Sequence, residues 1–207
     1  MKVKDFNGFH VDILQAPTLP PAKFSNIGLG AAISIRYYWV FNYKKYITLY
    51  LGLFSKKFKQ EDKSFTTDFQ YGTFKIRKEN SAYMYNTFST PIDIDFSLPY
   101  SIDKKSKNIF VPTAAIDILL NIAYLSHRLN LVGSSSFTGP RLVIEYQDIE
   151  GKTKKVAWET KLEYGMARFC GDDMEADFAL RFTPVPDKWT TKGLEKIRKS
   201  AAKIMNK

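Results

Sequence analysis

The stretch that decides the fold runs from Thr113 to Gly133 and reads TAAIDILLNIAYLSHRLNLVG. Its apolar residues recur at helical spacing in two series, Ile116, Leu119, Leu120 and Ala123, and Ile118, Ile122, Leu125 and Leu129. Pro112 stops the preceding segment, Thr113 can act as N-cap, and Gly133 can adopt the left-handed conformation that ends a helix. The pattern predicts a helix over 113–132. Because most of its circumference is apolar, a sheet is expected to cover it.

A membrane span is the alternative reading of this stretch, since about 20 helical residues reach about 30 Å. However, Asp117 and Arg128 would each cost roughly 2.5–3.5 kcal/mol near the bilayer centre. Asn121 and His127 would add to that cost. We therefore interpret 113–132 as a buried core helix.

Alternating apolar residues on both sides of this helix predict strands. A hairpin is expected over 29–54, a strand at 92–98, a second hairpin over 141–147 and 153–164, and a last strand at 178–182. The fold class predicted is α+β: an antiparallel β-sheet or sandwich packed on one long central helix, plus a C-terminal amphipathic helix.

Three regions follow from these patterns. Residues 1–26 are expected to form a flexible arm, because Pro17, Pro20 and Pro21 exclude a helix there. Residues 27–186 are expected to form one α+β domain. Residues 187–207 are expected to form a basic helix, with Leu194, Ile197, Ala201 and Ile204 on one face.

Composition bounds the partners of the chain. The 207 residues carry 31 Lys and Arg against 21 Asp and Glu, a net charge of +10. So basic a small protein is expected to meet a polyanion: nucleic acid, an anionic membrane surface or an acidic partner. The single cysteine, Cys170, excludes an internal disulfide and indicates a reducing compartment. The N-terminus contains no apolar signal segment, so export is not expected.

Few residues are candidates for catalysis or for binding a metal or a phosphate. His10 and His127 have no further ligands at metal-binding spacing, and Cys170 has no nearby histidine in the sequence. The acidic run 172–177 lacks the glycine and the final glutamate of a calcium loop, and Gly28-Leu29-Gly30 is not followed by the Lys-Ser/Thr of a phosphate loop. The sequence therefore predicts a non-enzymatic protein without cofactor, metal or small-molecule substrate.

Lysine clusters are the candidate contact sites, because they recur at turns that could converge on one end of the sheet. Aromatic residues of the kind that stack on bases are not interleaved with them, which favours phosphate-backbone or surface electrostatics. The candidate membrane or nucleic-acid contacts are Lys44, Lys45, Lys56, Lys57, Lys59, Lys104, Lys105, Lys107, Lys192, Lys196, Lys199 and Lys203. Phe137, in the loop 134–140, either packs back onto the domain or is held out for self-association.

The segment from Asn121 to Gly133, followed by Gly139-Pro140, ends a helix in aromatic–x–x–x–Arg–Leu–Asn and runs into a glycine-containing turn. Together with the basic charge, the Pro-rich arm and the aromatic strands, it resembles matrix proteins of non-segmented negative-strand RNA viruses, of the rhabdovirus and bornavirus type. Arms of such proteins often carry P-T/S-A-P or P-P-x-Y budding motifs. Here Pro17-Thr18-Leu19-Pro20 has Leu in the third place, and Pro20-Pro21-Ala22-Lys23 has no Tyr.

The resemblance implies a virion structural protein that self-assembles as a homo-oligomer. It would bind an anionic membrane surface, a viral nucleocapsid or RNA through basic loops. It also implies a location in the virion and the host-cell cytoplasm, peripheral at the inner membrane face. The alternative hypothesis is a bacteriophage or other virion structural protein, an adaptor or minor capsid component, without a membrane role.

Overall fold

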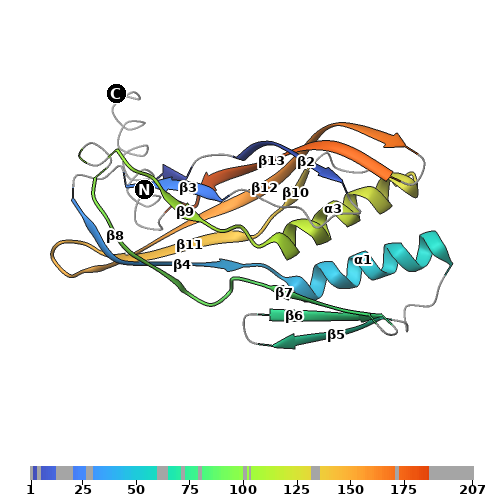
Figure 1. The fold of residues 1–207 in the computed structure, drawn as a ribbon, viewed down its shortest axis with the longest axis horizontal. Coiled ribbons are helices and arrows are strands. Elements are labelled where there is room, and N and C mark those ends of the chain that lie inside the picture. The colour runs from blue at the N-terminus through green and yellow to red at the C-terminus, as the bar shows by residue number, and fades with distance from the viewer. Residues whose placement is uncertain are drawn as a thin grey trace, which may run out of the picture.

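The structure is a computed structural model, and most of it is antiparallel β-sheet (Figure 1). It describes residues 2–3, 6–12, 21–26, 30–59, 65–70, 73–78, 81–99, 102, 104–131, 136–170 and 173–186. The expected C-terminal helix at 187–207, with Lys192, Lys196, Lys199 and Lys203, lies outside these described residues.

The main sheet has seven strands and carries most of the core. Its strand order is β2-β13-β12-β11-β4-β8, and β10 pairs with residues 161–163 of β12. The strands are β2 (Phe6–Asp12), β4 (Ala32–Val40), β8 (Ile92–Ser97), β10 (Ser136–Thr138), β11 (Arg141–Gln147), β12 (Thr153–Cys170) and β13 (Asp173–Pro184). Strand β2 lies within the segment expected to be an arm, and it pairs with β13.

Two three-stranded sheets accompany the main sheet. One has the order β1-β3-β9, and the other has the order β5-β6-β7. Their strands are β1 (Lys2–Val3), β3 (Ala22–Ser25), β9 (Lys107–Ile109), β5 (Phe65–Gln70), β6 (Thr73–Lys78) and β7 (Ser81–Asn86). Sheet β1-β3-β9 brings Ala22 opposite Ile109, and both side chains are buried in the main core.

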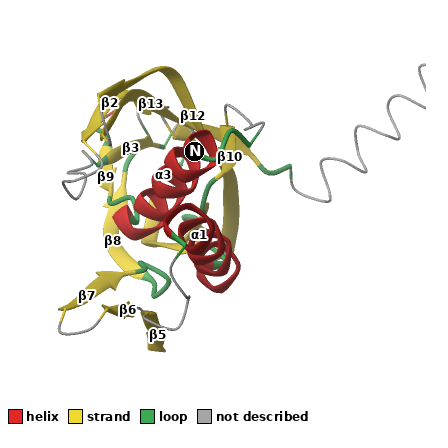
Figure 2. Cartoon of the chain, turned by 90° about the vertical axis from the view of Figure 1, so that its right-hand side faces the viewer, coloured by secondary structure: helices red, strands yellow, loops and turns green. Residues whose placement is uncertain are grey.

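Two helices, α1 (Tyr43–Phe58) and α3 (Thr113–Arg128), lie side by side (Figure 2). One face of α3, including Ile116, Leu119 and Leu120, packs against the main sheet in a cluster with Trp39 and Leu142. The opposite face, formed by Ala114, Ala115, Ile118, Ile122 and Leu125, packs against Tyr43, Ile47 and Leu53 of α1. Helix α3 is thus covered on both sides, which explains why it is apolar around most of its circumference.

The predicted fold class is wrong. In place of one long central helix, the described residues form mostly antiparallel sheet together with two helices of 16 residues each, α1 and α3. Helix α3 ends at Arg128 rather than near residue 132, because Asn130 adopts the left-handed conformation with φ +52°. The N–H of Asn130 donates to the carbonyl of His127, and the N–H of Leu131 donates to that of Ser126. Asparagine thus provides the helix-ending turn that we expected from Gly133.

The predicted hairpin over 29–54 is also wrong in its second half, because residues from Tyr43 onward form α1. Tyr43 and Ile47 are buried against α3, and Tyr50 and Phe54 continue the same face at helical spacing. The stretch therefore fits both a strand and a helix, and the aromatic content favours the strand. Contact with α3 decides for the helix.

Candidate polyanion-binding surfaces

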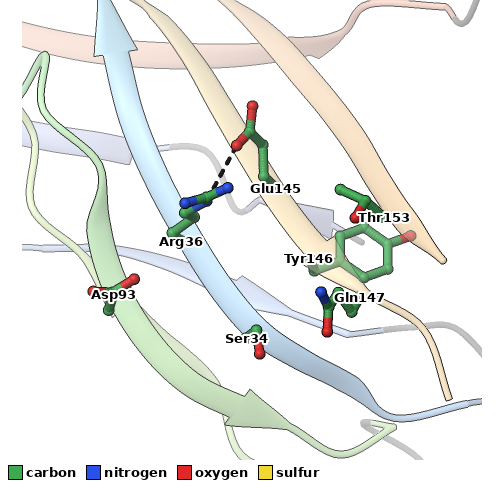
Figure 3. A pocket seen from close by; sticks show the side chains of 7 residues that line it. All are labelled: Ser34, Arg36, Asp93, Glu145, Tyr146, Gln147 and Thr153. Atoms are coloured by element: carbon green, nitrogen blue, oxygen red, sulfur yellow. Dashed lines mark ion pairs between the residues drawn. The ribbon is translucent and has the colours of Figure 1, made fainter. Parts of the chain in front are cut away.

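The outer face of the main sheet, away from the helices, carries rows of opposite charges. At its centre, Glu145 on β11 lies 3.2 Å from Arg36 Nε (Figure 3). Glu145 also lies 3.0 Å from Lys155 Nζ. Tyr38 donates its hydroxyl to Glu145 at 3.3 Å and accepts from Lys155 at 2.7 Å. The hydrogen bond from Lys155 lowers the pKa of Glu145 below its usual value, against the opposing effect of desolvation.

Cations elsewhere on this face and its turn are paired in the same way. The pairs are Arg141 with Glu159, Lys161 and Arg181 with Glu163, Lys152 with Glu150, and Lys154 with Asp148. Charges that neutralise one another at contact distance attract little from solution. This sheet face is therefore a weak candidate for binding a polyanion.

A shallow polar groove of about 190 Å³ lies on the same face, where β4 bulges against β11. Ser34 at the bulge has φ +47°, a left-handed conformation that costs about 1 kcal/mol or more for a residue with a side chain. The groove is lined by Ser34, Arg36, Asp93, Glu145, Tyr146, Gln147 and Thr153 (Figure 3). Arg36 and Glu145 are engaged with each other there, so we assign no polyanion to the groove. Among the described residues, no group of three or more His, Cys, Asp or Glu side chains could hold a metal ion.

Helix α1 contrasts with the sheet face, because it contains no acidic residue from Tyr43 to Phe58. Lys45, Leu49, Gly52 and Lys56 follow one another at helical spacing, and all four are exposed. Lys59, the C-cap, extends this outward stripe, and Lys44 and Lys57 flank it. Within the described part of the chain, none of these five lysines has a carboxylate partner, although Lys45 Nζ lies 5.3 Å from the centre of the Tyr46 ring.

The dipole of α1 acts differently on the lysines at its two ends. Lys56 and Lys57 lie in the last turn, where the helix dipole favours positive charge by about 0.3–1 kcal/mol each. Lys44 and Lys45 lie in the first turn, where the same dipole disfavours them and no acidic residue offsets the effect. These two lysines therefore do not stabilise the fold through the helix dipole.

A second basic group lies at the opposite end of the molecule (Figure 1). The register pairs Ala32 with Ser97 and Ile33 with Gln147, so the loop after β8 and the turn after β11 share the end where β4 begins. Lys104, Lys105 and Lys107 lie there, and Lys107 Nζ is 5.4 Å from the centre of the Phe96 ring. Helix α1 instead follows the other end of β4. We expected these lysines to lie in turns that converge on one end of the sheet. In the structure they form two groups at opposite ends.

Phe137 lies in β10, where it pairs with Leu162 of β12. Its side chain is half-buried and contacts both core clusters. The sequence left two arrangements open for Phe137, packed back onto the domain or held out for a partner, and the structure has the first. A role for Phe137 in self-association stays a prediction.

Sequence reasoning missed two exposed isoleucines. Ile149 at the turn between β11 and β12 is 72% exposed, and Ile102, between β8 and β9 in the sequence, is 69% exposed. An isoleucine within a charged turn (Asp148-Ile149-Glu150-Gly151-Lys152) is a usable signal, because the neighbouring residues offer it no apolar cover.

The chain matches no family model, no curated protein and no solved structure. Among the described residues, neither helix is long and apolar enough to cross a membrane.

Proposed function

We propose that this protein is a matrix-type structural protein of a virion, which assembles in many copies and binds viral RNA or nucleocapsid phosphates through α1. The observation that carries the proposal is the contrast between paired and unpaired cations. The cations named above on the sheet face and its turn have carboxylate partners, whereas within the described residues the five lysines of α1 have none.

The chemistry of the α1 stripe supports phosphate as its ligand. Lysine ammonium groups spaced along one helix face can each contact a phosphate and release a condensed counterion. From Lys45 to Lys56 the helix rises roughly 16 Å at about 1.5 Å per residue, a span that covers several nucleotides. The exposed stripe carries no aromatic side chain for base stacking, so binding is expected to be independent of RNA sequence.

The class of protein rests on the combined features of the chain. High net positive charge and the resemblance of 121–133 to matrix proteins both support a structural role. Self-assembly belongs to this role, and sedimentation velocity over a range of salt concentrations measures it directly.

The test compares unpaired with paired lysines in equal number. We expect the triple variant Lys45→Gln, Lys56→Gln and Lys59→Gln to lower the affinity for single-stranded RNA. The slope of log K against log salt is expected to fall by about 2, because each phosphate contact contributes about 0.7. The matched control is Lys152→Gln, Lys154→Gln and Lys155→Gln, which removes the same charge from ion-paired positions.

The control variant is expected to change the slope by less than half as much. Equal slopes for both variants would mean that net charge alone governs binding and that α1 has no special role. Circular dichroism of each variant confirms that α1 is still formed.

A further inference from the structure

We infer that the groove at the bulge of β4 binds a neutral glycan through one pyranose ring. Arg36, Asp93 and Gln147 bind the hydroxyls of the ring, and the apolar pair Ile33 and Phe96 packs against its C–H groups. The site goes beyond the proposed function and does not depend on it, because it lies on the outer sheet face and shares no residue with α1. We name it the bulge groove and define it by the residues that line the groove together with the apolar pair.

The bulge in β4 creates the hollow. It lies between the register pairs Arg36–Glu145 and Ile33–Gln147, so two residues of β4 face a single residue of β11. One of these two is Ser34, and its φ of +47° is unfavourable for a residue with a side chain. Bulges bend a strand and redirect its side chains, and both bulges and strained residues recur beside functional sites. The strained bulge therefore marks this part of an otherwise regular sheet as a candidate site.

Polar side chains from four adjacent strands surround the hollow (Figure 3). Asp93 comes from β8, Arg36 and Ser34 from β4, Gln147 from β11 and Thr153 from β12. Among the described residues, the side chains of Asp93, Gln147 and Thr153 form no hydrogen bond or ion pair with the rest of the protein. They leave a carboxylate that accepts, an amide that donates and accepts, and a hydroxyl that does both. This set can bind several hydroxyls of one ligand.

The charges at the groove and its border cancel. Arg36 and Lys155 contact Glu145 at 3.2 and 3.0 Å, and Asp93 is the second carboxylate, so two positive charges stand against two negative ones. A guanidinium carries five N–H donors, so the Nε contact with Glu145 leaves donors of Arg36 for a ligand. An anion would be repelled by Asp93, and a cation would be repelled by Arg36. A neutral ligand with several hydroxyls can use both groups.

An apolar platform adjoins these polar groups. Ile33 on β4 lies directly opposite Phe96 on β8, and the two side chains are 41% and 49% exposed. Ile33 is also opposite Gln147 of β11, and residues directly opposite one another share a sheet face, so the platform borders the groove. Lys107 Nζ lies 5.4 Å from the centre of the Phe96 ring, which still remains half exposed. A pyranose ring has apolar C–H groups on its face and hydroxyls around its edge, so one molecule can contact both parts of the site.

Two other small ligands fit the groove less well. A zwitterionic amino acid would be held by ion pairs with Arg36 and Asp93, and exposed ion pairs contribute little in water. A nucleotide would bring its phosphate beside Asp93. The volume of about 190 Å³ also suits one small ring, because pockets for drug-sized ligands measure about 300–1,000 Å³. Charge and size together therefore favour a single sugar ring.

The experiment uses saturation-transfer-difference NMR on the full chain with the methyl glycosides of glucose, galactose and mannose. We expect at least one glycoside to bind with a millimolar Kd. The variant Asp93→Ala is expected to lower that affinity about tenfold, the usual effect of losing a hydrogen bond to a charged group. The matched control is Glu159→Ala, which removes a carboxylate of β12 that pairs with Arg141 outside the groove. The control is expected to bind as the parent does.

A second variant tests the apolar platform. Phe96→Ala is expected to weaken saturation transfer to the C–H protons of the ring, and circular dichroism checks that each variant is folded. Absence of saturation transfer to all three glycosides overturns the inference. Equal binding by the parent and Asp93→Ala also overturns it, as does stronger transfer to free alanine than to any glycoside, which would assign the groove to a zwitterion.

The same titration separates this inference from the proposed function. The triple variant Lys45→Gln, Lys56→Gln and Lys59→Gln is expected to bind the glycoside as the parent does, although its RNA binding is weakened. Loss of glycoside binding in that variant would contradict the separate location of the sugar site. Normal RNA binding in that variant would contradict the role of α1 and leave the sugar site unaffected.

Discussion

Asn42 Oδ1 accepts a hydrogen bond of 3.0 Å from the backbone N–H of Lys45, and this side-chain cap begins helix α1. The contact lies in the four residues Asn42-Tyr43-Lys44-Lys45, which the sequence presents equally well as a hairpin turn. Because the cap starts a helix, the lysines that follow lie on one helix rather than in separate loops. The candidate RNA-binding stripe therefore depends on this cap.

Asn42→Ala is expected to lower the free energy of unfolding by about 1 kcal/mol, the usual cost of losing an N-cap side chain. Urea denaturation followed by circular dichroism measures the change. Asn42→Asp retains the acceptor and adds a negative charge at the positive end of the helix, beside Lys44 and Lys45. It should therefore be at least as stable as the parent, and if it is as weak as Asn42→Ala, the cap assignment is wrong.

Gly52→Ala is expected to stabilise the protein by about 0.5–1 kcal/mol. Gly52 lies inside α1, and a Cβ added there would meet no atom within 4 Å, so the helix gains alanine's propensity without a clash. Gly139→Ala provides the opposite case, because its Cβ would overlap the Thr160 hydroxyl and side chain. In thermal melts, the melting temperature should rise for Gly52→Ala and fall for Gly139→Ala.

The pH dependence of stability is expected to carry the signature of Asp117. Burial on α3 raises the pKa of this carboxyl from 3.8 to about 7. The folded state therefore holds a proton between about pH 4 and pH 7 that the unfolded state has lost. Stability rises as pH falls through this window, by up to about 1.4 kcal/mol per unit, and the gain is absent above pH 7.

Asp117→Asn isolates this contribution. The variant should be more stable than the parent at pH 8, because it removes a carboxylate that burial penalises. It should also lose the rise in stability between pH 7 and pH 4. Urea midpoints measured at several pH values provide the comparison, and a parent-like pH profile in the variant would rule Asp117 out as its cause.

Phe137→Ala is expected to lower the free energy of unfolding by roughly 1–3 kcal/mol, less than for a fully buried phenylalanine because the side chain is half-buried. The cause is lost packing against both core clusters. Sedimentation velocity of the same variant tests its predicted part in self-association. Weaker association with an unchanged melting temperature would show that the side chain is held out for a partner instead.

Glu145→Gln is expected to raise the affinity for RNA a few-fold at low salt. The substitution frees the charges of Arg36 and Lys155, which Glu145 neutralises at 3.2 and 3.0 Å. The effect should vanish near 0.5 M salt, where exposed charges are screened. An unchanged affinity at low salt would show that pairing does not decide which cations of this protein bind polyanions.

Local patterns in the sequence determined several elements by themselves. The two apolar series from Ile116 to Leu125 predict a buried helix, and the strict alternation after Thr153 predicts a strand with one buried face. The net charge of +10 likewise requires no structure to be read. Each of these features depends on residues close together in the chain, so periodicity and composition are sufficient to detect them.

Only the tertiary structure decided between helix and strand at Tyr43–Phe58, because the deciding contacts come from α3, far along the chain. The same holds for the end of α3 at Arg128, where Asn130 adopts positive φ. It also holds for the lysines. Lys155 forms an ion pair with Glu145 and donates a hydrogen bond to Tyr38, which lies 117 positions away in sequence. Lys45 and Lys56 meet no carboxylate among the described residues. Pairing depends on strand register and three-dimensional proximity. A sequence shows which residues are charged, but the fold determines which charges remain available to a partner.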